Sequence, residues 1–217
     1  MRLGGSQNDI LREWRKAQRE ALVSARQRVD PVTLGQWRES IDQFLERGFA
    51  DLSTGIFAFC WPIKNEYDAR PLARRVRERG GTTALPVVIA PRAPLEFREW
   101  HPGVELAIGA LDIPYPKESP KLVPTTLLVP MNGFDGAGYR LGYGAGFFDR
   151  TLAALPDRPR TIGVAYELSR MATIRPQAYD IPMDFVVTER ARYRRVDGML
   201  VADDPRCAPP PKLASTP

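Results

Sequence analysis

The chain has 217 residues, of which 43% are hydrophobic, so it can form one sizeable domain with a buried core, and wholesale disorder is excluded. Its formal net charge is +5 and its sequence pI is near 9.4, which favours anionic partners such as nucleic acid, nucleotides or acidic small molecules. The arginines are spread over several segments without an aromatic–basic ladder, so we expect a solvated basic surface and no nucleic-acid partner.

The cysteine and histidine counts exclude several kinds of site. Cys60 and Cys207 indicate neither a disulfide framework nor a zinc site, and a cytoplasmic location is the simplest interpretation. The single histidine, His101, lies beside a Pro-Gly turn, which excludes most histidine-based metal and triad chemistry. No apolar run approaches the length of a membrane span, so we expect no membrane partner.

Helices alternate with buried strands in the first part of the chain. Apolar residues recur at helical spacing in three segments, while two others are continuously apolar, which is typical of strands buried on both faces. The expected helices cover residues 8–29, 33–47 and 71–79, and the expected strands cover residues 55–61 and 82–89. Pro86 indicates an irregular or edge course for the second strand. This order predicts a parallel βαβ unit.

Two groups of polar residues in this part are candidates for a ligand site. Trp61, Glu66 and Asp68 follow the first strand, and ligands in parallel sheets gather at the carboxyl ends of strands. The first half of the first helix is strongly basic, with Arg12, Arg15, Lys16 and Arg19. These four residues form either a solvated face or a set of cations over an anion site, and we favour the solvated face.

Shorter strands and one more helix are expected in the second part. Residues 95–100 and the region around Leu106 predict strands, as a hairpin beside the main sheet, and a stiff proline-rich connection follows through residues 113–120. Further strands are expected over residues 126–129, 161–166 and 185–188, and a helix over residues 147–155. The predicted fold is α/β: a mainly parallel sheet flanked by helices on both faces, Rossmann-like and three-layered, with a small accessory hairpin. We expect one domain over residues 1–202 and a proline-rich mobile tail over residues 203–217.

A glycine-rich stretch between a predicted strand and a predicted helix is the main candidate site: Gly138-Tyr-Arg-Leu-Gly-Tyr-Gly-Ala-Gly-Phe-Phe-Asp-Arg150. Glycines let successive backbone amides converge on one anion, and the helix that follows adds the positive end of its dipole. Arg140 and Arg150 can complete a phosphate clamp with bidentate hydrogen bonds. The stretch is neither a Walker A sequence nor a dinucleotide fingerprint, and alternating glycines also occur in bulged hairpins. From the residues, we favour phosphate binding over a purely structural loop.

Two adjoining blocks resemble the 5-formyltetrahydrofolate cyclo-ligase family, also called methenyltetrahydrofolate synthetase. Leu128-Val-Pro-Met-Asn-Gly-Phe-Asp135 is similar to the family's VP-x-x-x-FD segment, and residues 138–150 are similar to its RLG-x-G-x-G-[YF]-[YF]-D signature. Weaker similarities run through almost the whole chain. The resemblance implies an enzyme that uses ATP and Mg²⁺ to convert 5-formyltetrahydrofolate to 5,10-methenyltetrahydrofolate. It also implies an iminium phosphate intermediate and the release of ADP and phosphate.

The resemblance further implies roles for particular residues. ATP binding is implied for Asn8, Arg12, Arg140, Leu141, Gly142, Tyr143, Gly144, Ala145, Gly146, Phe147 and Phe148. Folate binding is implied for Trp61, Glu66, Tyr143, Gly144, Ala145, Gly146 and Phe147. Catalytic contacts are implied for Arg140, Tyr143 and Arg150, and Mg²⁺ ligands for Asp149 and Asp180.

The chain departs from the commoner family pattern at several of these places. Asn8 stands where many members have a lysine, and Tyr115 stands where a glutamate is frequent. Gln177 and Tyr179 replace the usual glutamate and histidine, and Phe147 and Phe148 replace tyrosines. One alternative is therefore an ATP-dependent paralogue acting on another amide or formamide, and another is a non-enzymatic nucleotide or nucleic-acid binder. We expect a monomer whose partners are a folate substrate and ATP.

Overall fold

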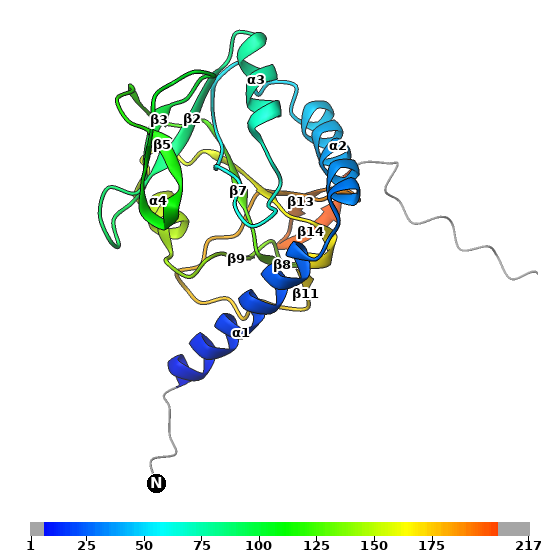
Figure 1. Ribbon diagram of the computed structural model, residues 1–217. Coiled ribbons are helices and arrows are strands. Elements are labelled where there is room, and N and C mark those ends of the chain that lie inside the picture. The colour runs from blue at the N-terminus through cyan, green and yellow to red at the C-terminus, as the bar shows by residue number, and fades with distance from the viewer. Residues whose placement is uncertain (1–6, 204–217) are drawn as a thin grey trace, which may run out of the picture.

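The computed structural model describes residues 7–203, and a nine-stranded mixed sheet forms its centre (Figure 1). The strand order is β14-β13-β12-β10-β7-β1-β2-β3-β6. The five adjacent strands from β12 to β2 are parallel, while β13 and β14 at one end and β3 and β6 at the other are antiparallel. These nine strands are β1 (Ile56–Ala58), β2 (Thr82–Val87), β3 (Glu96–Glu99), β6 (Lys121–Leu122), β7 (Thr126–Pro130), β10 (Arg160–Val164), β12 (Phe185–Val187), β13 (Arg192–Val196) and β14 (Met199–Ala202). The predicted α/β class with a mainly parallel core is confirmed.

Helices cover both faces of this sheet, as predicted. The described residues form four α-helices: α1 (Gln7–Gln27), α2 (Pro31–Gly48), α3 (Arg70–Glu78) and α4 (Phe147–Ala154). In β7, Leu128 packs into the core beneath α2 and α3, whereas its neighbours Leu127 and Val129 pack into the core beneath α4. Successive side chains of a strand point to opposite faces, so a strand covered on both sides must be apolar throughout. This burial explains the continuous apolar runs in the sequence.

The predicted βαβ unit is confirmed by the parallel register of β1 and β2, in which Ile56 lies opposite Thr82 and Ala58 opposite Ala84. Strand β2 lies between β1 and β3, so it is not an edge strand. Strand β1 pairs only as far as Ala84, and Pro86 lies beyond its reach. Phe59 N donates the last hydrogen bond on this side, to Ala84 O, and Pro86, which has no amide hydrogen to donate, stands just past the end of the β1–β2 ladder.

The accessory hairpin is formed by other residues than expected. Residues 96–99 belong to the main sheet as β3, and the hairpin pairs β4 (Leu106–Ile108) with β5 (Pro114–Pro116), which the sequence indicated as a connection. Hydrogen bonds from Gly109 N to Ile113 O and from Lys117 N to Glu105 O set the register. The two prolines of β5 then occupy positions that need no amide donor, because hydrogen-bonded and non-hydrogen-bonded pairs alternate along an antiparallel ladder.

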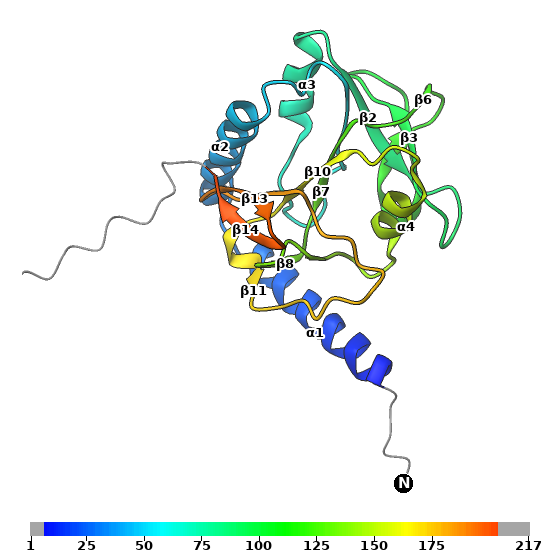
Figure 2. The same ribbon diagram turned by 180° about the vertical axis from the view of Figure 1, so that it is seen from behind.

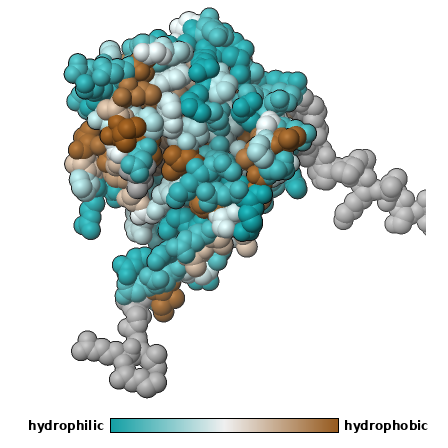
Figure 3. Space-filling model, viewed as in Figure 1, coloured by the Kyte–Doolittle hydropathy of each residue, from teal (hydrophilic) through white to brown (hydrophobic). Residues whose placement is uncertain are grey.

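A second, three-stranded sheet carries the start of the glycine-rich stretch. It consists of β8 (Gly133–Asp135), β9 (Arg140–Leu141) and β11 (Arg170–Met171), with β8 in the middle. Figures 1 and 2 show that α1 passes beside this small sheet and projects beyond it. The surface of α1 in the view of Figure 3 is mostly hydrophilic. Helix α1 thus packs against the rest of the protein mainly through its later turns.

Two further differences from the sequence concern the C-terminal part. The hairpin of β13 and β14 was not predicted, and it extends the sheet beyond β12. Residues 204–217 of the predicted tail, with Cys207, lie outside the described residues. Within residues 7–203, no helix combines the length and apolarity that a membrane crossing requires.

Candidate active site

Two cavities meet at the glycine-rich loop. The larger, of about 980 Å³, lies between α1, the loop and residues 177–181. The smaller, of about 150 Å³, lies between the ends of β1 and β2, the β4–β5 hairpin and the start of α4. Tyr143, Ala145 and Gly146 line both cavities. Ligands held in the two cavities would therefore meet at these three residues.

The glycine-rich stretch consists of two structurally different parts, a hairpin turn and a loop. Gly138 (φ +82°) lies in the turn of the β8–β9 hairpin, where Asp135 Oδ1 accepts hydrogen bonds from Ala137 N and Tyr139 N. For this hairpin, the first part of the glycine-rich stretch, the alternative of a purely structural turn is therefore correct. The loop proper follows β9 and uses left-handed backbone at Gly144 (φ +96°) and Gly146 (φ +64°), which glycine adopts without steric cost.

The start of α4 is open to an anion. Gly146 is its N-cap residue, and no described side chain caps the helix there. The first amides of a helix lack intrahelical acceptors and lie at the positive end of the helix dipole. An anion in the large cavity would satisfy these amides, so the loop fits phosphate.

The basic residues of α1 line the large cavity, and the expectation of a solvated face is wrong for Arg15 and Arg19. Arg19 Nε donates to Gly142 O at 2.6 Å, and Arg15 Nη2 donates to Asp180 Oδ2 at 2.6 Å. Burial, followed by the charge of Arg15, lowers the pKa of Arg19, yet an arginine remains charged at neutral pH. Helix α1 therefore adds positive charge to the side of the cavity opposite the loop.

Arg140 is buried at the base of the same cavity. Its Nη1 donates to Ile181 O at 2.6 Å, and its Nη2 donates to Asp149 Oδ1 at 2.7 Å. Burial lowers the pKa of Arg140, and the neighbouring Asp149 charge opposes that shift. The guanidinium is thus held rigidly between β9, α4 and the segment before β12.

Arg150 contacts the loop itself. Its Nη2 donates to Ala145 O, and its guanidinium lies over the Phe147 ring at 5.5 Å from the centroid. Its side chain also lines the large cavity. The predicted clamp of two arginines therefore has one buried member and one that braces the loop.

Two carboxylates in the large cavity fit a hard cation bound to phosphate. Asp149 Oδ1 accepts from Arg140 and from Ile181 N at 3.0 Å, while Asp180 Oδ2 accepts from Arg15 and from Gln177 N at 2.7 Å. Every hydrogen bond described for either carboxylate falls on that one oxygen. Mg²⁺ is commonly bound by one or two carboxylates together with substrate phosphates. The donors fit this arrangement, whereas the described residues contain no group of three or more His, Cys, Asp or Glu side chains that could hold a metal alone.

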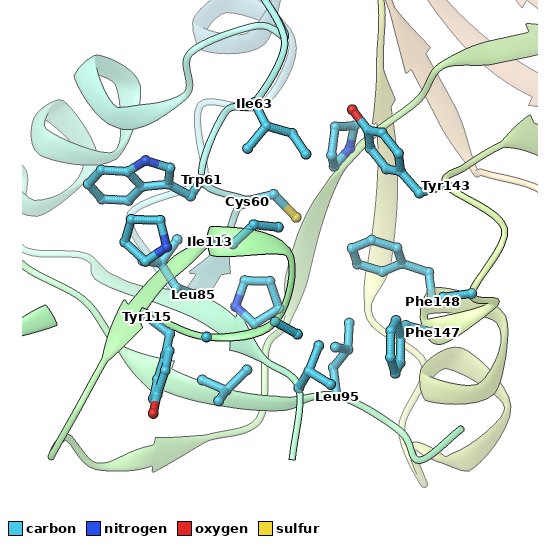
Figure 4. Close-up of a pocket in the computed structure, with 18 of the residues that line it drawn as sticks. Cys60, Trp61, Ile63, Leu85, Leu95, Ile113, Tyr115, Tyr143, Phe147 and Phe148 are labelled. Atoms are coloured by element: carbon cyan, nitrogen blue, oxygen red, sulfur yellow. The ribbon is translucent and has the colours of Figure 1, made fainter. Parts of the chain in front are cut away.

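The small cavity is predominantly apolar and aromatic. Figure 4 shows Tyr143, Phe147 and Phe148 along one wall and Trp61 and Tyr115 along the opposite wall. The Arg70 guanidinium lies over the Trp61 ring at 4.6 Å from the centroid, and this contact orients the indole. Such walls suit a flat ring system, with few polar groups to set its orientation.

Glu66 is the acidic group of this cavity. Its Oε1 accepts from Tyr143 Oη at 2.8 Å, and its Oε2 accepts from Ile63 N at 3.1 Å. Burial raises the pKa of Glu66, and the charge of Arg26 opposes that shift. Burial and the Glu66 charge raise the pKa of the Tyr143 hydroxyl, which therefore remains a donor at neutral pH.

Comparison with known proteins shows the family of this chain. The family model of the 5-formyltetrahydrofolate cyclo-ligase family matches residues 11–189. The chain belongs to this family. It is 33% identical over 130 residues to the 5-formyltetrahydrofolate cyclo-ligase of Escherichia coli strain K12, covering 57% of this chain and 71% of that protein. The Mycolicibacterium smegmatis protein of the same name is 29% identical over 137 residues, covering 59% of this chain and 71% of that protein.

Solved structures show the same architecture. The NMR structure of Aquifex aeolicus 5,10-methenyltetrahydrofolate synthetase matches with a TM-score of 0.73 and 27% identity, over 86% of this chain and 95% of that one. The Mycoplasma pneumoniae 5,10-methenyltetrahydrofolate synthetase matches with a TM-score of 0.67 and 20% identity, over 81% of this chain and 98% of that one. The second likeness concerns the fold alone.

Every residue implied by the cyclo-ligase resemblance lines at least one of the two cavities. The large cavity is lined by Asn8, Arg12, Arg140, Leu141, Gly142, Gly144, Asp149, Arg150 and Asp180, and the small one by Trp61, Glu66, Phe147 and Phe148. Phe148, assigned to ATP, thus faces the small cavity, which we call the ring cavity from here on. Gly144, assigned to both ligands, faces only the large cavity. Asp68 lines neither cavity and instead pairs with Arg70 at 2.8 Å.

The sequence did not indicate several residues that line or support the two cavities. Arg26, Val88 and the lining of the β4–β5 hairpin other than Tyr115 were not singled out. Arg26 had a detectable signal, because a charged residue late in an amphipathic helix must find a partner once that helix packs. The rest of the hairpin lining had none, since its approach to β2 depends on long-range contacts.

Proposed function

We propose that this protein converts 5-formyltetrahydrofolate to 5,10-methenyltetrahydrofolate with consumption of ATP. The observation that carries the proposal is the sharing of Tyr143, Ala145 and Gly146 by a basic cavity and an aromatic one. A nucleotide in the first and a folate ring in the second would bring a terminal phosphate and a formyl group to one loop. The relatives' names supply the substrate class, and the described chain supplies the arrangement.

In this proposal the formyl oxygen attacks the γ-phosphorus and ADP leaves. N10 of the folate then attacks the formyl carbon, the C–O bond breaks to release phosphate, and N10 loses its proton as the ring closes. No protein nucleophile is required, so catalysis rests on positioning and on electrostatic stabilisation. Arg140, the first amides of α4 and Arg19 would hold the phosphate charge, while Glu66 and Trp61 would orient the ring.

Asp149 and Asp180 are the residues that would hold Mg²⁺, which would neutralise phosphate charge when bound. Both carboxylates are anchored by hydrogen bonds from backbone amides and arginines. That anchoring fixes where their oxygens lie before any ligand enters. Carboxylates that are already held in place reduce the entropic cost of ordering the site when Mg²⁺ binds.

The test combines the purified protein with ATP, Mg²⁺ and 5-formyltetrahydrofolate and follows the near-ultraviolet absorbance of the methenyl product. We expect the absorbance to rise only when all three are present, and to be lost in Asp149→Asn. Asp157→Asn, at an exposed aspartate that lines neither cavity, is the matched control. A folded wild-type protein that binds ATP but forms no methenyl product would reject the proposal.

A second candidate, an ATP-dependent enzyme of the same fold acting on another amide or formamide, is favoured by one observation. Tyr115 lines the ring cavity, and the Arg98 guanidinium lies 5.6 Å from its ring centroid. An aromatic wall there suits a ring edge that makes few hydrogen bonds. Measuring ADP release with a series of formamides separates the candidates: release with one of them that exceeds release with the folate would favour the second.

A further inference from the structure

Arg26 is buried in the last turn of α1, although it is a charged residue. Its side chain is 3% exposed, and it is the buried residue of that helix. A buried guanidinium is costly unless its donors are satisfied, so its contacts define what the surrounding structure requires. Nothing in the proposed reaction assigns a role to this residue.

Two hydrogen bonds and one ion pair hold the Arg26 guanidinium. Its Nε donates to Lys64 O at 2.8 Å, and its Nη2 donates to Tyr143 Oη at 3.2 Å. The same Nη2 lies 3.7 Å from Glu66 Oε1, which also accepts from Tyr143 Oη. One planar group therefore joins α1 to two polar residues of the ring cavity, Tyr143 and Glu66.

The first of these contacts supports a strained turn. Lys64 (φ +50°) and Asn65 (φ +60°) are consecutive non-glycine residues in left-handed conformation, which is costly for side chains other than glycine. The turn is closed by a hydrogen bond from Glu66 N to Ile63 O at 3.0 Å. Arg26 holds the Lys64 carbonyl in the middle of this turn, two residues before Glu66, whose side chain lines the cavity.

We propose that Arg26 is a positioning residue for the ring cavity: it holds the Lys64–Asn65 turn and keeps the Tyr143–Glu66 pair aligned, so that Glu66 meets the ligand as a carboxylate. This proposal rests on the proposed function for the identity of the ligand. Arg26 lines neither cavity, so it acts through the other two residues rather than on the substrate. A Glu66 carboxylate accepts hydrogen bonds from ring N–H groups, whereas a neutral carboxylic acid would also present a donor.

The charge environment of Glu66 gives Arg26 a measurable effect. Burial alone would favour the neutral acid, and Arg26 is the largest opposing influence on the pKa of Glu66. The titratable and charged groups that face it are Arg26 from α1, Lys64 from its own turn, Cys60 after β1, Tyr143 from the loop and Tyr166 after β10. Arg26 and Lys64 are the two cations in this set, so loss of Arg26 should raise the pKa of Glu66.

The kinetic test compares Arg26→Met and Arg26→Lys with Arg28→Met in the full chain. Methionine keeps most of the buried stem, lysine keeps the charge but not the planar fork, and Arg28 is an exposed arginine two residues further along. For Arg26→Met we expect the KM for the folate to rise by about tenfold or more, with kcat reduced by less than about threefold. Arg26→Lys should lie between this variant and the wild type, and Arg28→Met should match the wild type. Folded Arg26 variants with a wild-type KM would overturn the proposal.

A ligand-free measurement tests the same role independently of turnover. Carbon-13 NMR titration of glutamate carboxyl groups, with the Glu66 signal assigned through Glu66→Gln, gives the Glu66 ionisation in the unliganded protein. We expect its pKa to rise in Arg26→Met and to rise less in Arg26→Lys. An unchanged Glu66 titration in folded Arg26→Met would overturn the proposal. Should the wild type prove inactive on folate, the proposed function fails while this titration still decides the role of Arg26.

Discussion

Arg140 Nη2 donates to Asp149 Oδ1 at 2.7 Å, and this ion pair joins β9 to the first turn of α4. The two residues stand at opposite ends of the loop that shapes the junction of the cavities. The arginine side chain is 5% exposed and the aspartate 22%, so solvent screens the pair only in part. The position of the loop therefore depends on a contact between its two flanking elements.

Replacing Arg140 with alanine should damage both activity and stability. The change removes a cation from the large cavity and leaves the Asp149 carboxylate without its ion-pair partner. We expect kcat/KM for ATP to fall by about tenfold or more, equivalent to about 1.4 kcal/mol, and the free energy of unfolding to fall by about 2 kcal/mol. Steady-state kinetics and urea unfolding measure the two effects. Arg158→Ala, which removes an exposed pair with Asp184, should leave the kinetics unchanged. Equal kinetic losses in both variants would contradict a specific role for Arg140.

Replacing Arg19 with methionine should weaken nucleotide binding. The variant keeps the apolar stem and removes a charge that lies beside Gly142 and Gly144. We expect the Kd for ATP, measured by calorimetry, to rise roughly tenfold and to become less dependent on salt. The exposed Arg28→Met should retain wild-type affinity. If the Arg19 variant bound ATP with wild-type affinity, Arg19 would have no role in nucleotide binding, as the solvated face favoured from the sequence implies.

Replacing Trp61 with alanine should affect the ring ligand and spare the nucleotide. The indole forms one wall of the small cavity and carries the Arg70 guanidinium. Loss of the aromatic wall should raise the KM for the folate by about tenfold or more, while the Kd for ATP changes by less than about twofold. Trp14→Ala is the matched control, since Trp14 also carries an arginine, Arg175 at 4.2 Å, but lines neither cavity. A folate KM that stays normal in Trp61→Ala would remove this residue from the site.

The ionisation of Glu66 should make folate use pH-dependent. Burial raises its folded-state pKa above the unfolded value of about 4.3, so the folded protein keeps this proton over a window that starts there and extends upward. The stability contribution of this group is present below the unfolded pKa and is lost as the pH rises through the folded pKa. Because the carboxylate is the binding form, kcat/KM for the folate should rise over that same window.

Glu66→Gln should abolish that rise and increase the KM for the folate by about tenfold, equivalent to the loss of one hydrogen bond to a charged group. Two pH series check these predictions. One measures kcat/KM, which should rise with pH, and the other measures the free energy of unfolding, to which the contribution of Glu66 should fall with pH. Glu105→Gln, an exposed glutamate paired with Lys117, is the control. If kcat/KM for the folate still rose over the same pH window in Glu66→Gln, the ionisation responsible would belong to another group.

Local patterns in the chain were sufficient for the layers of the fold and for the anion loop. Continuous apolar runs indicated strands covered on both sides, and the glycines of residues 138–150 indicated backbone that side chains do not permit. Such features depend on a residue and its near neighbours, because conformational freedom and periodic burial are local properties. The carboxylates Asp149 and Asp180 were likewise visible in the sequence, although their role as metal ligands stays a prediction.

Long-range packing decided what completes the site. Arg15 and Arg19 become cavity residues because α1 packs across the loop, and their spacing along the helix is the same as that of a solvated face. Arg26 meets Glu66 across 40 positions of the chain and Tyr143 across 117 positions. The β4–β5 hairpin tolerates its prolines because they occupy positions without amide hydrogen bonds, and it forms a cavity wall because it packs against β2. Contacts between distant segments depend on how whole elements dock, and no local pattern in this chain specifies that docking.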